Sequence, residues 1–338
     1  MKVLVTGGLG FIGSETVVSL IENKFDVVVV DNLYNSKLNV LDRIKKITGV
    51  RPTFYDVDVS DISKLEPVFK KEKIDAIIHF AGYKAVGESV SKPLEYYENN
   101  LCTTFALLKC MEKYHVNNLV FSSSATVYGL PDSTPIFETN EVKSATSPYG
   151  ESKVMIERVL TDVSVVHKEY NIALLRYFNP IGAHKSGLLG EDPNGIPNNL
   201  LPFIAKVATG VLPLITIFGN DYPTPDGTCV RDYVHVCDLA YGHVLALNKL
   251  TTNPGLVVYN LGTGKGTSVL EMIKTYEKAT GIKINYTVGA RRPGDIPISF
   301  ANCDKAKKEL GFVCKYTIED ACRDSYNFQK AENNRSKK

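Results

Sequence analysis

The chain has 338 residues, of which 44% are hydrophobic and 22% are charged, and its formal net charge is +2. This near balance argues against nucleic-acid binding, which normally needs a concentrated basic face, and no apolar run approaches the ~20 residues of a membrane span. The seven cysteines form no C-x-x-C pair and the six histidines show no ligand spacing. We therefore expect no metal site and reduced thiols in a cytoplasmic protein.

The first residues predict a unit that binds a dinucleotide. Lys2–Thr6 is a short apolar run typical of a buried strand, and residues 14–23 have a helical pattern. Between them, Gly7, Gly10 and Gly13 have the spacing G-x-x-G-x-x-G. Gly7 and Gly10 would let the backbone approach a pyrophosphate, and Gly13 would let the helix pack close to the strand. The free N–H groups at the start of the helix would bind the phosphates.

A second strand at residues 25–30 ends at Asp31. A carboxylate at this position accepts hydrogen bonds from the adenosine ribose and repels a 2′-phosphate, so the sequence predicts NAD rather than NADP. The alternation continues with helices at 38–47, 62–70 and 94–114 and strands at 53–58, 76–80 and 119–121. This order predicts an α/β fold with a doubly wound (Rossmann) parallel sheet, which forms an NAD-binding domain over residues 1–178.

Polar or small residues follow several of these strands, at the positions where an open parallel sheet binds its ligands. Asp58 and Val59 fit the adenine edge of a cofactor as well as they fit an ordinary turn. The small residues after the strand at 76–80 would permit close approach of a cofactor. Ser124 is the last of three serines at the end of the strand at 119–121. Its hydroxyl could hydrogen-bond a reacting group, and a simple polar turn is an equally good interpretation.

Ser147 and Pro148 form a helix start that opens the segment we interpret as catalytic. The serine hydroxyl can cap free N–H groups, and proline suits the first helical turn. In the helix at 148–169, Tyr149 and Lys153 stand four residues apart and therefore share one face. A nearby ammonium group favours the phenolate and lowers the pKa of tyrosine, which makes Tyr149 a candidate general base.

The spacing of this pair is weak evidence by itself, because Tyr326 and Lys330 match it as well. The surroundings distinguish the two pairs. The first opens a helix after the strand that ends at Ser124, in a fold whose glycines and Asp31 deliver NAD. Tyr326 lies in the last predicted helix without such neighbours, and we interpret it as structural.

The second half of the chain is less regular. A strand at 173–176 is followed by long loops at 182–200 and 219–235, which are uncommon in compact domains unless they have a function. We expect a smaller mixed lobe over 179–330, with some later segments returning to the first domain, and a disordered tail at 331–338. The elements predicted for the lobe are helices at 200–209, 236–249, 268–280, 303–310 and 318–329 and strands at 214–218, 257–260 and 284–287.

The motifs at residues 6–13 and 176–179, the three serines, and the tyrosine and lysine pair occur together in one chain. Together they resemble the extended short-chain dehydrogenase/reductases that act on nucleotide sugars. Five further motifs make the chain similar to the NAD-dependent UDP-sugar 4-epimerases of that family, over roughly residues 1–330. These motifs lie at residues 190–193, 195–200, 218–222, 227–233 and 291–295.

The resemblance implies reversible oxidation at the C4 atom of the sugar, which interconverts UDP-glucose and UDP-galactose. Tyr149 would remove the proton of the 4-hydroxyl group while a hydride passes from C4 to NAD. Lys153 would hold the nicotinamide ribose and keep the pKa of Tyr149 low, and Ser124 would hydrogen-bond the 4-oxygen. The 4-keto sugar would then turn over and receive the hydride on its other face. Tightly bound NAD, a role in galactose metabolism, UDP-hexose substrates and a homodimer are implied as well.

The same resemblance implies two sets of contacts. The implied NAD contacts are Gly7, Gly10, Phe11, Ile12, Gly13, Asp31, Asn32, Leu33, Tyr34, Asn35, Ser36, Asp58, Val59, Phe80, Ala81, Gly82, Tyr83, Lys84, Asn99, Ser124, Tyr149, Lys153 and Phe178. The implied substrate contacts are Ser124, Tyr149, Asn179, Asn199, Leu200, Thr216, Ile217, Phe218, Arg231, Arg292, Asp295 and Ser299. The forked guanidinium groups of Arg231 and Arg292 suit a diphosphate. Without the resemblance we would interpret either arginine as part of a surface ion pair.

Ser299 falls where this family carries a residue that faces the C2 substituent of the sugar. A bulky tyrosine there is associated with plain hexoses, whereas a small side chain leaves room for an N-acetyl group. We hypothesise that the protein also interconverts UDP-GlcNAc and UDP-GalNAc. The alternative is that other walls of the pocket close this space.

Other proteins of the same fold are alternatives. A 4,6-dehydratase needs an acid pair, usually Asp-Glu just after the Ser124 position, and Ala125 and Thr126 stand there instead. A UDP-glucuronate 4-epimerase or decarboxylase would need a carboxylate-binding group, which the sequence does not exclude. A non-catalytic NAD-binding sensor commonly lacks the tyrosine or the lysine, and both Tyr149 and Lys153 are present.

Overall fold

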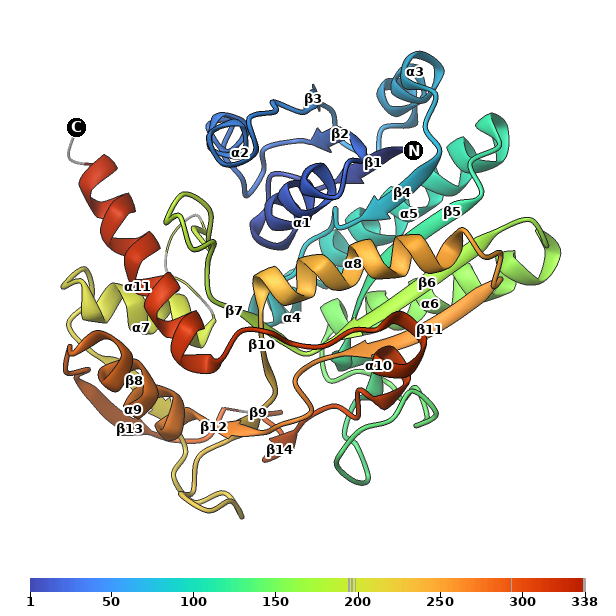
Figure 1. Ribbon diagram of the computed structural model, residues 1–338. Helices are drawn as coiled ribbons and strands as arrows, with labels where there is room; N and C mark the ends of the chain where they lie inside the picture. Colours follow the sequence, from blue (N-terminus) through green and yellow to red (C-terminus); the bar gives the residue numbers. More distant parts are fainter. Residues whose placement is uncertain (194, 196, 198, 293, 337–338) are drawn as a thin grey trace.

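The computed structural model describes residues 1–193, 195, 197, 199–292 and 294–336. Its centre is a parallel seven-stranded sheet with the order β11-β6-β5-β4-β1-β2-β3 (Figure 1). The chain moves outward from β1 to β3 and then places β4 on the other side of β1, so a topological switch point lies between β1 and β4. This confirms the predicted doubly wound fold. The strands are β1 (Lys2–Thr6), β2 (Asp26–Asp31), β3 (Thr53–Asp56), β4 (Ala76–His79), β5 (Asn118–Ser124), β6 (Asn171–Tyr177) and β11 (Leu256–Leu261).

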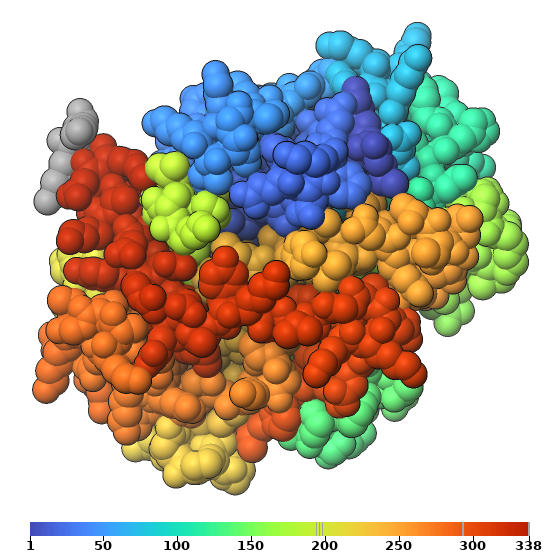
Figure 2. All heavy atoms as spheres, in the orientation of Figure 1, coloured from blue at the N-terminus to red at the C-terminus, as the bar shows by residue number. Residues whose placement is uncertain are grey.

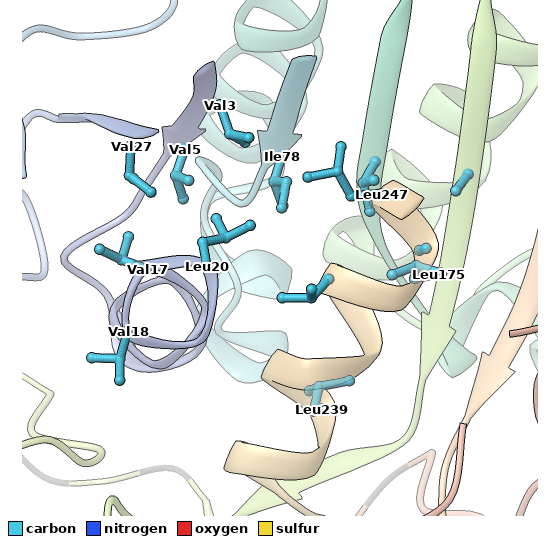
Figure 3. Packing of buried hydrophobic residues seen from close by; sticks show 14 of the residues in the cluster. Val3, Val5, Val17, Val18, Leu20, Val27, Ile78, Leu175, Leu239 and Leu247 are labelled. Atoms are coloured by element: carbon cyan, nitrogen blue, oxygen red, sulfur yellow. The ribbon is translucent and has the colours of Figure 1, made fainter. Parts of the chain in front are cut away.

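Helices cover both faces of the central sheet because its strands are apolar on both sides. Successive residues of a strand point to opposite faces, so Val3 and Val5 of β1 belong to one core and Leu4 to the other. Figure 3 shows the first core, where Leu20 of α1 and Leu247 of α8 lie next to the sheet. The first face carries α1 (Phe11–Glu22), α2 (Val40–Thr48) and α8 (Val236–Leu250), and the second carries α3 (Ile62–Glu72), α5 (Pro93–Tyr114) and α6 (Pro148–Val166).

The smaller lobe has its own apolar core, in which α7, α9 and α11 pack around the parallel strand pair β8 and β13. Two sets of short strands join it to the large sheet: the pair β7 and β10, and the sheet β12-β9-β14. None of the helices in the described part of the chain has the length and apolarity to cross a bilayer. The remaining elements are α4 (Val86–Ser91), η1 (Ala125–Tyr128), β7 (Asn179–Ile181), α7 (Leu200–Ala208), β8 (Ile215–Phe218), β9 (Val230–Arg231), β10 (Tyr233–His235), β12 (Thr267–Ser268), α9 (Val269–Thr280), β13 (Tyr286–Gly289), β14 (Ile298–Ser299), α10 (Asp304–Leu310) and α11 (Ile318–Arg335).

Two late elements that the sequence assigned to the smaller lobe belong to the large sheet instead. The strand predicted at 257–260 is β11, which pairs in parallel with β6 at the edge of the sheet. The helix predicted at 236–249 is α8, which packs against α1, so residues far apart in sequence lie side by side (Figure 2). Leu261 and Leu247 join the core of the first face. These are segments that return to the first domain.

The structure also differs from the sequence at the C-terminus, where a tail was expected from residue 331. α11 continues to Arg335, because its last turns are held by other parts of the chain. Glu332 pairs with Arg43 of α2 at 2.7 Å, and Arg335 donates to the carbonyl oxygen of Gly187 at 2.9 Å. Residues 337 and 338 of the expected tail, and Ile196, Asn198 and Pro293 of the sequence motifs, lie outside the described residues.

Candidate active site

The turn between β1 and α1 is shaped by positions that require glycine. Gly7 has a φ of +65°, and a Cβ atom there would lie 2.9 Å from the backbone nitrogen of Ala81. A Cβ atom on Gly13 would lie 2.2 Å from the carbonyl oxygen of Gly7, so α1 packs directly on the turn. No side chain caps the start of α1 at Gly10, which leaves the first N–H groups of the helix for an anionic ligand.

Asp31 lies at the end of β2 and holds the loops that follow β1 and β2. Its carboxylate accepts hydrogen bonds from the N–H groups of Leu9 at 3.0 Å and Leu33 at 2.9 Å, and from the Ser36 hydroxyl at 2.7 Å. A carboxylate offers about four acceptor positions, so one remains for a ribose hydroxyl. Asp31 therefore fits the predicted contact with NAD and also orders the glycine-rich turn.

A cavity of about 350 Å³ opens at the carboxyl ends of the central strands. Every predicted NAD contact lines it except Leu33, whose backbone supports Asp31 and whose side chain packs on the core of the first face. Four of the predicted substrate contacts also line it: Ser124, Tyr149, Asn179 and Asn199. The cavity therefore brings predicted NAD contacts and predicted substrate contacts together at one place. From the sequence, only the resemblance suggested that these two sets of residues belong to one site.

Tyr149 and Lys153 lie on α6, as the sequence predicts. The Ser147 hydroxyl caps the helix by accepting from the N–H group of Gly150 at 3.2 Å, and Pro148 occupies the first turn. Both Tyr149 and Lys153 line the cavity. The ammonium of Lys153 lies 5.9 Å from the centre of the Tyr149 ring and donates to the carbonyl oxygen of Ser122 in β5.

The pKa values of this pair differ from the expectation of a tyrosine activated by its lysine. Burial raises the pKa of Tyr149, and a hydrogen bond with Ser124 opposes that rise. Burial also lowers the pKa of Lys153 to about 8, while the carboxylate of Glu157 on the same helix acts in the other direction. The structure therefore differs from the prediction, because the pKa of Tyr149 is raised by burial and not lowered.

Ser122, Ser123 and Ser124 at the end of β5 have three different partners. The Ser122 hydroxyl hydrogen-bonds the hydroxyl of Tyr177, and its carbonyl oxygen accepts the Lys153 ammonium at 2.8 Å. The Ser123 hydroxyl donates to Glu157 at 2.5 Å. Ser124 faces the cavity and caps η1 by accepting from the N–H group of Thr126 at 3.2 Å.

One side of the cavity is closed by the segment at residues 190–193. Glu191 accepts from the Lys84 ammonium at 3.0 Å and from the side-chain amide of Asn199 at 2.6 Å. Asp192 pairs with Lys37, which lies between β2 and α2. These ion pairs connect the long loop before α7 to the cofactor half. Sequence reasoning quoted the motif at 190–193 but assigned none of its residues to the site.

The other predicted substrate contacts lie in the smaller lobe and do not line this cavity. Arg231 pairs with Asp295 at 3.5 Å and donates to the carbonyl oxygen of Ile296 at 2.5 Å. The guanidinium of Arg292 lies 3.9 Å from the centre of the Phe218 ring. Thr216, Ile217 and Phe218 belong to β8, and Leu200 begins α7.

Backbone hydrogen bonds connect part of this group to the cavity. Ser299 stands opposite Arg231 in the pair β14 and β9, and its carbonyl oxygen accepts from the N–H group of Asp232 at 3.0 Å. The carbonyl oxygen of Asp232 in turn accepts from the N–H group of Asn179 at 3.0 Å. Asn179 lines the cavity, so two backbone hydrogen bonds connect Ser299 to the cavity wall. Arg231 directly precedes Asp232, the residue in the middle of this connection.

Sequence reasoning missed residues that shape the site through distant partners. The sequence predicts no role for Asn100, yet its side chain accepts from the N–H group of Tyr83 at 2.7 Å and donates to Ser152 of α6 at 2.9 Å. It thereby holds the loop after β4 against the helix that carries Tyr149. No local pattern marks such a residue, because its partners are far away in sequence.

Comparison with known proteins agrees with this arrangement. The family model described as GDP-mannose 4,6 dehydratase matches residues 4–325. A UDP-glucose 4-epimerase of Bacillus subtilis (strain 168) is 54% identical over 334 residues, which cover 99% of this chain and 98% of that protein.

Two solved structures have nearly the same fold, and each match covers 99% of both chains. The UDP-glucose 4-epimerase of Bifidobacterium longum, in complex with NAD+ and UDP, has a TM-score of 0.96 and 53% identity. That of Stenotrophomonas maltophila, with bound NAD and formylated UDP-arabinopyranose, has a TM-score of 0.97 and 46% identity. With this identity over nearly its full length, the chain belongs to the UDP-glucose 4-epimerase family.

Proposed function

We propose that this protein interconverts UDP-glucose and UDP-galactose by reversible oxidation and reduction at the C4 atom of the sugar. The observation that carries the proposal is the meeting of Ser124, Tyr149 and Lys153 at one cavity with the glycine-rich turn and Asp31. NAD is the cofactor, and the shape of the turn fits its pyrophosphate.

The residues of the chain divide the chemistry among them. When bound, NAD accepts a hydride from C4 of the sugar and returns it to the opposite face. Tyr149 takes the proton of the 4-hydroxyl group and later gives it back. Ser124, which hydrogen-bonds Tyr149, would also hydrogen-bond the 4-oxygen of the sugar. Lys153 supplies the positive charge beside the ring and favours the phenolate.

The smaller lobe, over residues 179–330, is proposed to hold the UDP group. Arg231 and Arg292 are candidates for the diphosphate, since a guanidinium makes charge-assisted bonds to such an anion. The pairing of Arg231 with Asp295 means that binding the diphosphate would exchange one anionic partner for another. Asn179 and Asn199 at the cavity wall are candidates for the sugar hydroxyls.

Dehydration is disfavoured by the residues that follow Ser124. Ala125 and Thr126 begin the helical turn η1 at the position where a 4,6-dehydratase carries its acid pair. A UDP-glucuronate 4-epimerase and a non-catalytic NAD-binding sensor remain the alternatives to the proposed activity. The second is disfavoured by the presence of the complete set Ser124, Tyr149 and Lys153.

Two finer assignments belong to this proposal. The small side chain of Ser299 supports acceptance of UDP-GlcNAc and UDP-GalNAc in addition to the plain hexoses. A homodimer is proposed because α5 and α6 pack side by side and expose apolar residues on each. Leu94 and Phe105 of α5 are 75% and 41% exposed, and Met155 and Val166 of α6 are 40% and 76% exposed. A second copy of the chain would cover these apolar side chains. We also propose a cytoplasmic location, as the site of galactose metabolism.

The proposal is tested with the purified protein. It should retain NAD, seen as bound nicotinamide absorbance, and convert UDP-galactose to UDP-glucose without added cofactor. Conversion of UDP-glucuronate alone, or of no UDP-sugar, would contradict the proposal. Light scattering after size-exclusion chromatography should give twice the mass of the chain, and a monomer would remove the homodimer from the proposal.

A further inference from the structure

A buried ion pair that does not line the cavity joins α6 to β6. The guanidinium of Arg176 contacts both carboxylate oxygens of Glu157, with its Nε at 3.0 and 3.2 Å and its Nη2 at 2.6 Å. The two residues are only 5% and 4% exposed. Burying two charges is expensive unless their geometry is well satisfied, and apolar side chains would often serve stability equally well. The pair therefore calls for an explanation beyond stability.

Ser123 is the third member of this group. It stands directly opposite Arg176 in the pairing of β5 with β6, and its hydroxyl donates to the same carboxylate at 2.5 Å. One carboxylate on α6 therefore fixes neighbouring residues on two strands. The residue after Ser123 is Ser124, the predicted partner of the sugar 4-oxygen.

The spacing on α6 connects this group to the predicted catalytic pair. Tyr149, Lys153 and Glu157 follow one another at intervals of four residues and share one face of the helix. Lys153 donates to the carbonyl oxygen of Ser122, and Glu157 accepts from the hydroxyl of Ser123. The helix therefore contacts two successive residues of the strand immediately before Ser124.

The segment after Ser124 is held by the same arginine. Its Nη1 donates to the hydroxyl of Tyr128 at 3.1 Å, at the end of η1, and that hydroxyl donates to the side chain of Asn260 at 2.6 Å. The guanidinium also lies 4.9 Å from the centre of the Tyr128 ring. Ser124 is thus fixed from both directions along the chain, by Ser123 before it and by η1 after it.

We propose that Glu157 and Arg176 are positioning residues, which fix the end of β5 against α6 and so set the place of Ser124 relative to Tyr149 and Lys153. The inference rests on the proposed epimerase activity, because Ser124 acts on the sugar only in that reaction. Neither residue touches a reacting atom. Their effect passes through Ser123 and η1, and a displacement of about 1 Å at a reacting group can reduce a rate about 100-fold.

The carboxylate has a second, electrostatic effect on Lys153, which would otherwise lose its proton more readily on burial. Removing Glu157 while keeping Arg176 would leave the guanidinium buried without its anionic partner. The titratable or charged groups that act on Lys153 or contact it are Tyr149 and Glu157 on α6 and His79 on β4, while Arg176 of β6 pairs with Glu157 and Tyr177 of β6 hydrogen-bonds Ser122.

The experiment compares two variants with one control. Ser123→Ala removes the hydroxyl and leaves the buried charges paired. Glu157→Gln/Arg176→Met removes both charges together and avoids an unpaired buried ion, which protects folding. Asp162→Asn is the matched control, because Asp162 pairs with Arg158 on the exposed side of the same helix, at 2.9 Å. Each protein is first checked for bound NAD and for its melting temperature.

The expected result is a loss in kcat with little change in KM for UDP-galactose. Ser123→Ala should lower kcat about tenfold and the double variant about 100-fold, with NAD retained and with the control equal to wild type. In the double variant the basic limb of the pH profile should move to lower pH, because the carboxylate that opposes the effect of burial on Lys153 is lost, and in Ser123→Ala it should stay in place. Wild-type kcat in both variants would overturn the proposal. A loss of kcat that comes with loss of NAD in Ser123→Ala would also overturn it, since the group would then only hold the fold.

A separate readout does not depend on the activity. The tyrosinate absorbance of each protein is titrated with pH, and the same titration in the Tyr149→Phe background is subtracted to isolate Tyr149. Displacing Ser124 removes the hydrogen bond that opposes the burial of Tyr149, so the pKa of Tyr149 should rise in both variants. An unchanged pKa would overturn the positioning role. If wild type converts no UDP-sugar, the proposed function fails, and this titration still decides the structural relation.

Discussion

The ammonium group of Lys153 donates to the carbonyl oxygen of Ser122 at 2.8 Å, while it lies 5.9 Å from the centre of the Tyr149 ring. The lysine is therefore anchored to the strand that carries Ser124. Burial raises the pKa of Tyr149 in the same surroundings. The fold therefore brings Tyr149 and Lys153 together at the cavity, beside the end of this strand.

Replacing Tyr149 by phenylalanine should abolish most of the epimerase activity. The substitution removes the proposed general base and keeps the ring, so kcat should fall by about 10²–10⁴-fold. NAD should stay bound, because the glycine-rich turn and Asp31 are untouched. The measurement is UDP-galactose conversion together with bound nicotinamide absorbance. Full activity in this variant would remove Tyr149 from the proposed role. Tyr326→Phe is the control, since that tyrosine packs in the core of the smaller lobe.

Replacing Gly13 by alanine should disrupt the cofactor turn. Its Cβ atom would lie 2.2 Å from the carbonyl oxygen of Gly7, and backbone must move to relieve this contact. We expect a loss of about 1–3 kcal/mol in the free energy of unfolding and a loss of bound NAD. Thermal unfolding and bound absorbance measure the two effects. Gly87→Ala is the matched control, because a Cβ atom there meets nothing within 4 Å. Equal behaviour of the two variants would contradict the prediction.

Replacing Asp31 by asparagine should weaken NAD binding and reduce discrimination against NADP. The carboxylate accepts from Leu9, Leu33 and Ser36, and each of these hydrogen bonds weakens when the charge is lost. We expect NAD affinity to fall about tenfold or more, measured by titrating protein stripped of cofactor. Asp26→Asn at the exposed start of the same strand should bind NAD like wild type. Unaltered affinity in Asp31→Asn would rule out its role at the ribose.

Replacing Glu15 by glutamine should stabilise the protein at high pH. Burial, helped by nearby carboxylates, raises the pKa of Glu15 from 4.5 to about 8, against the hydrogen bond from Cys237. A raised pKa means that the folded state binds the extra proton, so stability falls as pH rises from about 4.5 to 8. Above this range wild type carries a buried charge that the variant lacks.

The expected gain of Glu15→Gln is on the order of 5 kcal/mol at pH 9 and near zero at pH 4. Denaturant unfolding at the two pH values measures it. A gain that is the same at both pH values would show that the charge of Glu15 is not its source.

Replacing Ser299 by tyrosine should remove any activity on UDP-GlcNAc and UDP-GalNAc and leave the hexose pair nearly unchanged. Ser299 stands opposite Arg231 in the short sheet next to the cavity, so a larger side chain would fill space there. The four UDP-sugars are compared by kcat/KM in wild type and variant. If wild type converts no N-acetylated substrate while the variant keeps its hexose activity, other walls of the pocket set the specificity.

Several features of the site could be predicted because their signals are local. Hydrophobic periodicity locates β1, α1 and β2, and the glycine spacing with Asp31 follows from the geometry of one turn. Tyr149 and Lys153 share a face of α6 for the same reason, since four residues make about one helical turn. The resemblance added roles to these positions, including those of the smaller lobe.

The sequence by itself therefore determined the main strands and helices of the central sheet, the glycine-rich turn, and the shared helix face of Tyr149 and Lys153. Only the tertiary structure decided that β11 and α8 return to the large sheet, that Glu157 fixes Ser123 and Arg176, and that residues 190–193 close the cavity through Lys84 and Lys37. The physical reason is the same in each case. These contacts join residues that are 19 to 222 positions apart, and such pairs leave no periodic trace in the chain. The partners of these residues are identified only when the folded structure sets the strands and helices beside one another.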